Sequence, residues 1–158
     1  MSLAIIFPGQ GSQSVGMMKG FVDTPIVERT FLEANEILGI DLWTMAREGP
    51  AESLNQTVNT QPVMLVAGVA CWRAYREKNG ALPQWLAGHS LGEYSALVAA
   101  GALRFEDALP LVRFRAQAMQ EAVPAGTGAM AAVMGLDDAT LAGVCAEAAQ
   151  GQIVEPVN

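Results

Sequence analysis

Short apolar runs alternate along the chain with longer segments whose apolar residues recur at helical spacing. The runs at 3–7 and 84–88 are each followed by a turn rich in glycine, a pattern typical of buried strands. Periodic or small apolar residues predict helices over these segments: 26–38, 61–78, 90–101 and 105–123. Strands that alternate with helices indicate an α/β fold with a parallel sheet.

A glycine-rich stretch from Gly126 interrupts this pattern, so we divide the chain into 1–125 and 126–158. The second segment begins and ends with strand-like apolar runs, and between them lies a helix that Asp137 is placed to cap. The predicted strand, helix and second strand cover 128–136, 137–150 and 152–158. Because a domain rarely ends on a fresh strand, we expect the chain to be the N-terminal part of a longer protein.

Composition narrows the function classes. Hydrophobic residues make up 51% of the chain and charged residues 16%, as in a globular protein. The net charge is −7 and the nine basic residues are dispersed, which argues against binding to nucleic acid. The apolar stretches are too short for a membrane span, and the N-terminus does not resemble a signal peptide. We therefore expect a cytoplasmic protein without a membrane partner, in which Cys71 and Cys145 are buried free thiols.

The candidate nucleophile is Ser90, which lies in the sequence GHSLG between an apolar strand and a helix of small residues. This context is that of a nucleophile elbow, in which glycines allow close backbone packing and the helix N-terminus favours an oxyanion. The alternative is that Ser90 only caps the helix. His89 is the only histidine, but adjacent residues leaving a strand point to opposite sides, so a base for Ser90 is expected beyond residue 158.

An arginine in the 105–123 helix is out of place. Stepping 100° per residue puts Arg115 in the middle of an apolar stripe, with Leu111, Ala118 and Ala122 on one side and Ala108, Val112 and Met119 on the other. The polar face would hold Arg113, Gln117, Gln120 and Glu121. A guanidinium that faces the interior requires an anion or many acceptors. Its partner is either a structural acid, for which Glu93 is the candidate, or a substrate carboxylate.

The glycine-rich loop FPGQGSQ follows the first predicted strand at 7–13. Its spacing differs from that of a dinucleotide-binding fingerprint, but its exposed amides are suited to an anion. In elbow enzymes, one oxyanion amide belongs to the residue after the nucleophile, here Leu91, and another to an earlier strand-end loop. We expect this loop to supply the second amide.

Taken together, FPGQGSQ, AGHSLGEYSAL and VRFRAQAMQ resemble the corresponding motifs of the malonyl-CoA:acyl-carrier-protein transacylases, and GTGAMAAVMGL is similar to that family's entry into a small subdomain. The resemblance implies that Ser90 is acylated, that Gln10 and Leu91 supply the oxyanion amides, and that Arg115 binds the malonyl carboxylate. It implies a hydrolase-like α/β core over 1–125. Residues 126–158 would then be the first βαβ part of an inserted ferredoxin-like subdomain, with the catalytic histidine further downstream.

The implied reaction is ping-pong transfer of malonyl from malonyl-CoA to the phosphopantetheine thiol of acyl carrier protein, in fatty-acid biosynthesis, with no bound cofactor, no metal and a monomeric full-length enzyme. These 158 residues alone are expected to be weakly active or inactive. Three alternatives remain: an acyltransferase domain of a polyketide synthase, a serine esterase or lipase, and an inactive fragment that keeps only the fold. Arg115 argues against the hydrolase, because an enzyme acting on neutral esters does not need a buried cation beside its nucleophile.

Overall fold

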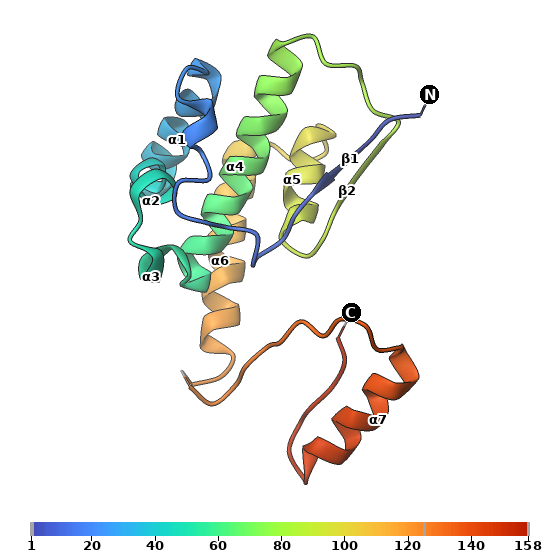
Figure 1. Cartoon of the computed structure of the whole chain (residues 1–158). Coiled ribbons are helices and arrows are strands. Elements are labelled where there is room, and N and C mark those ends of the chain that lie inside the picture. The colour runs from blue at the N-terminus through green and yellow to red at the C-terminus, as the bar shows by residue number, and fades with distance from the viewer. Residues whose placement is uncertain (1, 125, 158) are drawn as a thin grey trace. The chain divides into compact units, whose positions relative to one another are not determined.

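The computed structural model describes residues 2–124 and 126–157 (Figure 1). The chain forms two compact units, Met1–Ala125 and Gly126–Asn158. Each unit is described separately.

The sheet of the first unit contains two parallel strands, β1 (Ala4–Phe7) and β2 (Trp85–Gly88). Ala4 pairs with Trp85 and Phe7 pairs with Gly88, so the two strands end side by side (Figure 1). Both strands occur where the apolar runs predict them, and the α/β class with parallel strands is confirmed. The register matters for function because it places the loop after β1 next to the turn after β2.

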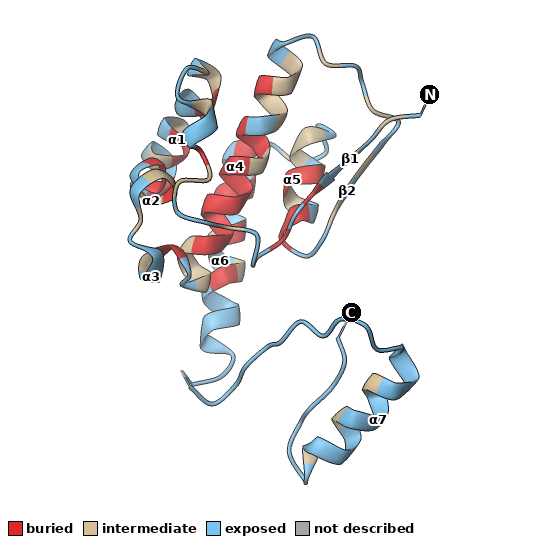
Figure 2. Cartoon of the chain, viewed as in Figure 1, coloured by how far each residue is buried: buried red, intermediate tan, exposed pale blue. Residues whose placement is uncertain are grey.

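The helices of the first unit are η1 (Lys19–Phe21), α1 (Pro25–Leu38), α2 (Leu42–Glu48), α3 (Ala51–Leu54), α4 (Thr57–Glu77), α5 (Gly92–Ala99) and α6 (Phe105–Glu121). Two starts differ from the prediction by more than one residue. Helix α4 begins four residues early, because polar residues that look like a loop form its first turn. Helix α5 begins two residues late, at Gly92, because the backbone of Ser90 is left-handed with a φ of 52°. Helix α4 is buried along its first two thirds and emerges at its C-terminal end, as predicted (Figure 2).

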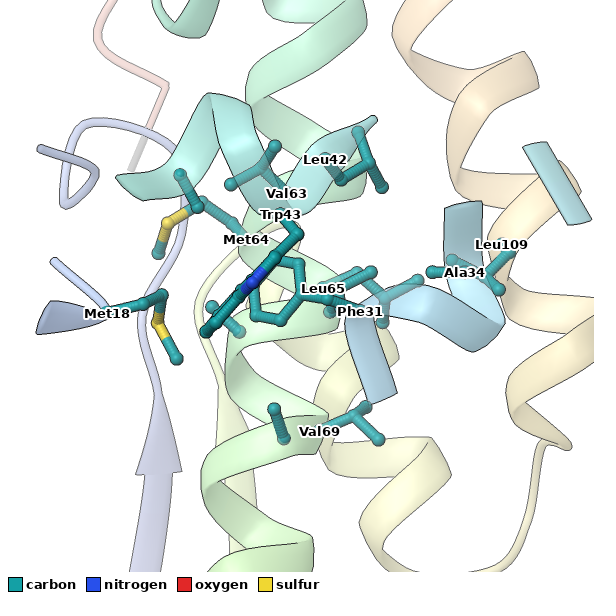
Figure 3. Close-up of a cluster of buried hydrophobic side chains, with 14 of the residues drawn as sticks. Met18, Phe31, Ala34, Leu42, Trp43, Val63, Met64, Leu65, Val69 and Leu109 are labelled. Atoms are coloured by element: carbon teal, nitrogen blue, oxygen red, sulfur yellow. The ribbon is translucent and has the colours of Figure 1, made fainter. Parts of the chain in front are cut away.

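The hydrophobic core surrounds α4, which packs against α1, α5 and α6. Phe31 from α1 contacts the ring of Trp43 from α2, with ring centroids 5.0 Å apart (Figure 3). Leu65 from α4 and Leu109 from α6 are completely buried in the same cluster. Burial of aromatic and branched side chains at this density stabilises the helical layer on which the candidate site is built.

The second unit contains one helix, α7 (Asp138–Ala149), within its described residues, 126–157. Asp137 caps it as predicted, because its carboxylate accepts a hydrogen bond of 2.9 Å from the backbone amide of Thr140. The strands predicted at 128–136 and 152–158 are wrong within these described residues, which hold no strand; Asn158 itself lies outside them. A strand needs a hydrogen-bonded neighbour, and here the apolar side chains of Met130, Met134 and Ile153 remain more than four-fifths exposed. The ferredoxin-like assignment of this unit stays a prediction.

The cysteines differ from the prediction in one respect. Both are free thiols, but Cys71 is exposed and Cys145 is half-buried. Partial desolvation at the α4 surface nevertheless raises the pKa of the Cys71 thiol. Within the described residues, no helix combines the length and hydrophobicity needed to cross a membrane.

Candidate active site

Ser90 occupies a sharp turn between β2 and α5. Its φ of 52° is in the left-handed region, which costs a residue with a side chain on the order of 1–3 kcal/mol and is concentrated at functional sites. The helix-capping alternative is wrong, because Leu91 is the capping residue of α5 and no side chain caps this helix end. Instead, the Ser90 hydroxyl accepts a hydrogen bond from Arg115. The serine is therefore held on a strained elbow with its hydroxyl directed to a cation.

Three glycines allow this turn to pack against the loop after β1. A Cβ atom at Gly88 would overlap the backbone of Gly92, and one at Gly92 would overlap the carbonyl oxygen of Phe7. A Cβ at Gly9 would lie 2.7 Å from the carbonyl oxygen of His89. No larger residue fits at these points without backbone movement, so the elbow and the loop are in direct backbone contact.

His89 precedes the candidate nucleophile in sequence, but its side chain is directed elsewhere. Its backbone amide donates a hydrogen bond of 3.1 Å to Phe7, which extends the strand pairing by one residue. Its ring Nδ1 is 3.1 Å from the position that a Cβ of Gly9 would take, so the ring lies against the β1 loop. In the described part of the chain, the His89 side chain forms no hydrogen bond with Ser90. This agrees with the expectation that His89 is not the base.

The side chain of Arg115, in α6, contacts the candidate nucleophile Ser90. Its guanidinium donates a hydrogen bond of 2.5 Å to Oε1 of Gln61 and one of 3.1 Å to Oγ of Ser90. The guanidinium carbon lies 5.8 Å from the centre of the Tyr94 ring. Arg115 forms no ion pair with Glu93, or with any other acid among the described residues, so Glu93 is not its structural partner. Its partners among these residues are all neutral. No carboxylate of the described residues neutralises the guanidinium next to Ser90, where a carboxylate-bearing ligand would find a bidentate partner.

The predicted stripe of α6 is partly wrong. The buried face consists of Phe105, Ala108, Leu109, Val112 and Ala116, whereas Leu111, Ala118 and Ala122 are exposed. Arg115 therefore lies at the edge of the buried face, half-buried. Arg113 is also not purely on the polar face, because it donates 2.7 Å to the carbonyl oxygen of Leu38 at the end of α1. Gln117, Gln120 and Glu121 are exposed, as predicted.

The glycine-rich loop is fixed by its glutamine side chains. Gln10 donates a hydrogen bond of 3.0 Å to the hydroxyl of Thr57, at the start of α4. Gln13 donates one of 2.9 Å to the side chain of Asn55, the C-cap residue of α3. Gln13 also accepts 2.8 Å from the backbone amide of Gly11. Among the described residues, no acceptor is assigned to the backbone amides of Gln10 or Leu91. Two amide donors on adjoining turns are thus available for an anion.

The sequence pattern did not indicate Gln61 as a residue of the candidate site. This residue lies in α4, is completely buried, and contacts Arg115 through its amide oxygen. A signal was present in the sequence, because Gln61 directly precedes Pro62 and is a polar residue within the apolar run that forms the buried part of α4. A buried amide in such a position requires specific partners.

An apolar hollow of the first unit, about 400 Å³ in volume, lies away from these residues. It runs along one side of β1 and is lined by Met64, Cys71, Trp72 and Ser95 among others, but not by Ser90 or Arg115. An apolar lining does not activate a nucleophile. The strained serine, and the arginine that forms no ion pair among the described residues, identify the candidate site better than this hollow does.

Comparison with known proteins shows to which family the chain is related. A sequence model of the family described as acyl transferase domain matches residues 4–155. The malonyl CoA-acyl carrier protein transacylases of Salmonella typhimurium and Escherichia coli are 57% and 58% identical to this chain over 156 residues, which are 98% of this chain and 50% of each relative. The chain thus spans about half the length of these curated relatives.

Solved structures show the same likeness. The acyl-carrier-protein S-malonyltransferase of Burkholderia pseudomallei is 61% identical, with a TM-score of 0.89 over 94% of this chain and 48% of that one. A malonyl-transacylase solved in complex with a type II polyketide acyl-carrier protein is 53% identical, with a TM-score of 0.94 over 100% of this chain and 52% of that one. Since the family match covers almost the whole chain and the solved relatives share its fold, the chain belongs to the acyl transferase domain family.

Proposed function

We propose that the full-length protein transfers a malonyl group from malonyl-CoA to the phosphopantetheine thiol of acyl carrier protein in fatty-acid biosynthesis. One observation carries the choice of acyl group: the guanidinium of Arg115 lies 3.1 Å from the Ser90 hydroxyl and has only neutral partners. An acyl donor with a free carboxylate neutralises this charge where the reaction takes place. The names of the relatives support the same choice.

In the first half-reaction, Ser90 Oγ attacks the thioester carbonyl. The Oγ–C bond forms, the C–S bond breaks, and CoA leaves as its thiol. In the second, the carrier-protein thiol attacks the malonyl ester, a new C–S bond forms, the Oγ–C bond breaks, and Ser90 regains its proton. Each attack places negative charge on the carbonyl oxygen. We assign the binding of that oxyanion to the backbone amides of Gln10 and Leu91, together with the N-terminus of α5.

The base that accepts the Ser90 proton is not assigned to any of these 158 residues, since the ring of His89 lies against Gly9. The family resemblance implies a histidine elsewhere in the full-length protein. Arg115 does not take this role, because a guanidinium stays protonated at neutral pH. Its hydrogen bond to Ser90 instead orients the hydroxyl before the acyl group arrives.

A second candidate is the same transfer in polyketide synthesis. The polyketide biosynthesis protein ThaF of Burkholderia thailandensis is 49% identical over 144 residues, which are only 12% of its length. The relatives of which this chain covers 50% are named malonyl CoA-acyl carrier protein transacylase. We therefore favour a free-standing transacylase over a domain of a polyketide synthase. Cytoplasmic location, a monomeric state, and the absence of cofactors and of membrane or nucleic-acid partners remain predictions.

Two variants of the full-length protein test the proposal. Intact mass spectrometry after incubation with malonyl-CoA should show a malonyl adduct that Ser90→Ala abolishes. In a coupled assay, Arg115→Ala should lower kcat/KM for malonyl-CoA by about 30-fold to several thousand-fold, since a lost charge-assisted contact in a desolvated site costs on the order of 2–5 kcal/mol.

Acetyl-CoA has no carboxylate to lose, so its kcat/KM should hold or rise in Arg115→Ala. Arg29→Ala removes the same charge from the exposed surface of α1 and should leave both substrates unchanged. An adduct that persists in Ser90→Ala contradicts the nucleophile assignment. A parallel loss for both thioesters in Arg115→Ala contradicts the choice of malonyl.

A further inference from the structure

Gln61 is a buried polar side chain to which the proposed reaction gives no role. It lies in the first third of α4 and is 0% exposed. A buried amide destabilises the fold unless both its oxygen and its nitrogen find partners. An apolar residue would satisfy packing alone, so the identity of its partners indicates what this glutamine does.

Both ends of the amide are used, and both partners lie on α6. The oxygen Oε1 accepts from Nη1 of Arg115 at 2.5 Å, and the nitrogen Nε2 donates to Sδ of Met119 at 3.3 Å. Arg115 and Met119 are four residues apart, so they share one face of the helix. Because a thioether sulfur only accepts, the contact with Met119 directs the acceptor end of the amide to Arg115.

The charge of the partner is the second clue. A carboxylate at position 61 would be the stronger partner for a guanidinium, but it would neutralise the arginine. The Gln61 amide, the Ser90 hydroxyl and the Tyr94 ring all leave the net charge in place. The buried, neutral amide of Gln61 therefore accepts from Nη1 of Arg115, while Nη2 of the same guanidinium donates to Oγ of Ser90.

We infer that Gln61 is a positioning residue that sets acyl specificity: it directs Arg115 toward Ser90 while leaving its positive charge available for the carboxylate of the acyl group. This inference rests on the proposed function. It goes beyond that function by assigning specificity to a residue that does not touch the reacting atoms.

The test is Gln61→Glu in the full-length protein, which keeps the size of the side chain and adds the opposing charge. The ratio of kcat/KM for malonyl-CoA to that for acetyl-CoA should fall by at least about tenfold, because the new carboxylate pairs with Arg115 and repels the malonyl carboxylate. Gln117→Glu makes the same charge change at an exposed position on α6 and should leave the ratio within about twofold of wild type.

Gln61→Leu serves as the second variant. It removes both hydrogen bonds without adding charge, so KM for malonyl-CoA should rise and the ratio should fall, but less than in Gln61→Glu. Thermal unfolding of each variant accompanies the kinetics. If Gln61→Glu does not fold, Gln61→Leu alone decides, because a wild-type ratio in that variant overturns the inference.

The outcomes separate this inference from the proposed function. A wild-type ratio in Gln61→Glu, or an equal loss for both thioesters with a lower melting temperature, overturns the positioning role and leaves Gln61 as a packing residue. If Arg115→Ala changes the ratio and Gln61→Glu does not, only this inference fails. If Arg115→Ala also leaves the ratio unchanged, the proposed malonyl specificity fails with it.

Discussion

Replacing Ser90 with glycine should leave the protein more stable than replacing it with alanine, although both substitutions remove the hydroxyl of the proposed nucleophile. Both substitutions remove the hydroxyl that accepts from Arg115, so that loss cancels in the comparison. What differs is the Cβ atom at a φ of 52°. A side chain in the left-handed region costs about 1–2 kcal/mol, and the extra freedom of glycine in the unfolded chain returns about 0.5–1 kcal/mol of this. We therefore expect glycine to be favoured by about 0.5–1 kcal/mol.

Urea unfolding of the two full-length variants measures this difference directly, provided that the slopes of the two transitions agree. Gln117 supplies the control, because it is exposed in the regular part of α6. There, alanine should be more stable than glycine by about 1 kcal/mol, so the sign reverses. If alanine is at least as stable as glycine at position 90 as well, the elbow is not strained and the argument from Ser90 conformation is refuted.

Two further predictions concern the scaffold. Gly92→Ala places a Cβ against the Phe7 carbonyl oxygen and should lower the free energy of unfolding, measured in urea, by about 1–3 kcal/mol. A wild-type value would show that the elbow does not contact the β1 loop. Asp41→Ala removes the cap of α2 and should cost about 1 kcal/mol at pH 7. The hydrogen bond from the backbone amide of Thr44 lowers the pKa of the Asp41 carboxyl in the folded state. The stability that the cap contributes is therefore fully present above the unfolded pKa of about 3.9 and is lost as pH falls through the lower folded pKa. A difference in unfolding free energy between wild type and variant that does not shrink in acid contradicts this.

Much of the core was predictable because its signals are local. The apolar runs that become β1 and β2 end in glycines, and the sequence GHSLG between a strand and a helix predicts the elbow on which Ser90 lies. The left-handed φ at Ser90 follows from the same sharp turn. The helical spacing of 105–123 also drew attention to Arg115, although it misjudged which neighbours are buried.

The rest depends on contacts between distant segments. Gln61 and Arg115 are 54 positions apart, so no local sequence pattern predicts the hydrogen bond between their side chains. Glu93 was a reasonable partner by sequence distance from Ser90, but the structure directs the guanidinium to neutral groups instead. In the second unit, the apolar run at 128–136 satisfies a strand pattern and still forms no strand, because pairing is a property of two segments and not of one.

Backbone contacts of Gly9, Gly88 and Gly92 with their neighbours hold the turn at Ser90, while side chains of α4 and α6 hold Arg115. The backbone of the turn and the position of the guanidinium thus depend on different residues. Under the proposed function, substitutions at Gln61 or Arg115 would change the preference for acyl groups while the three glycines keep the backbone of Ser90 in place. New acyl preferences would then require only a few changes on two helices, in evolution as in design.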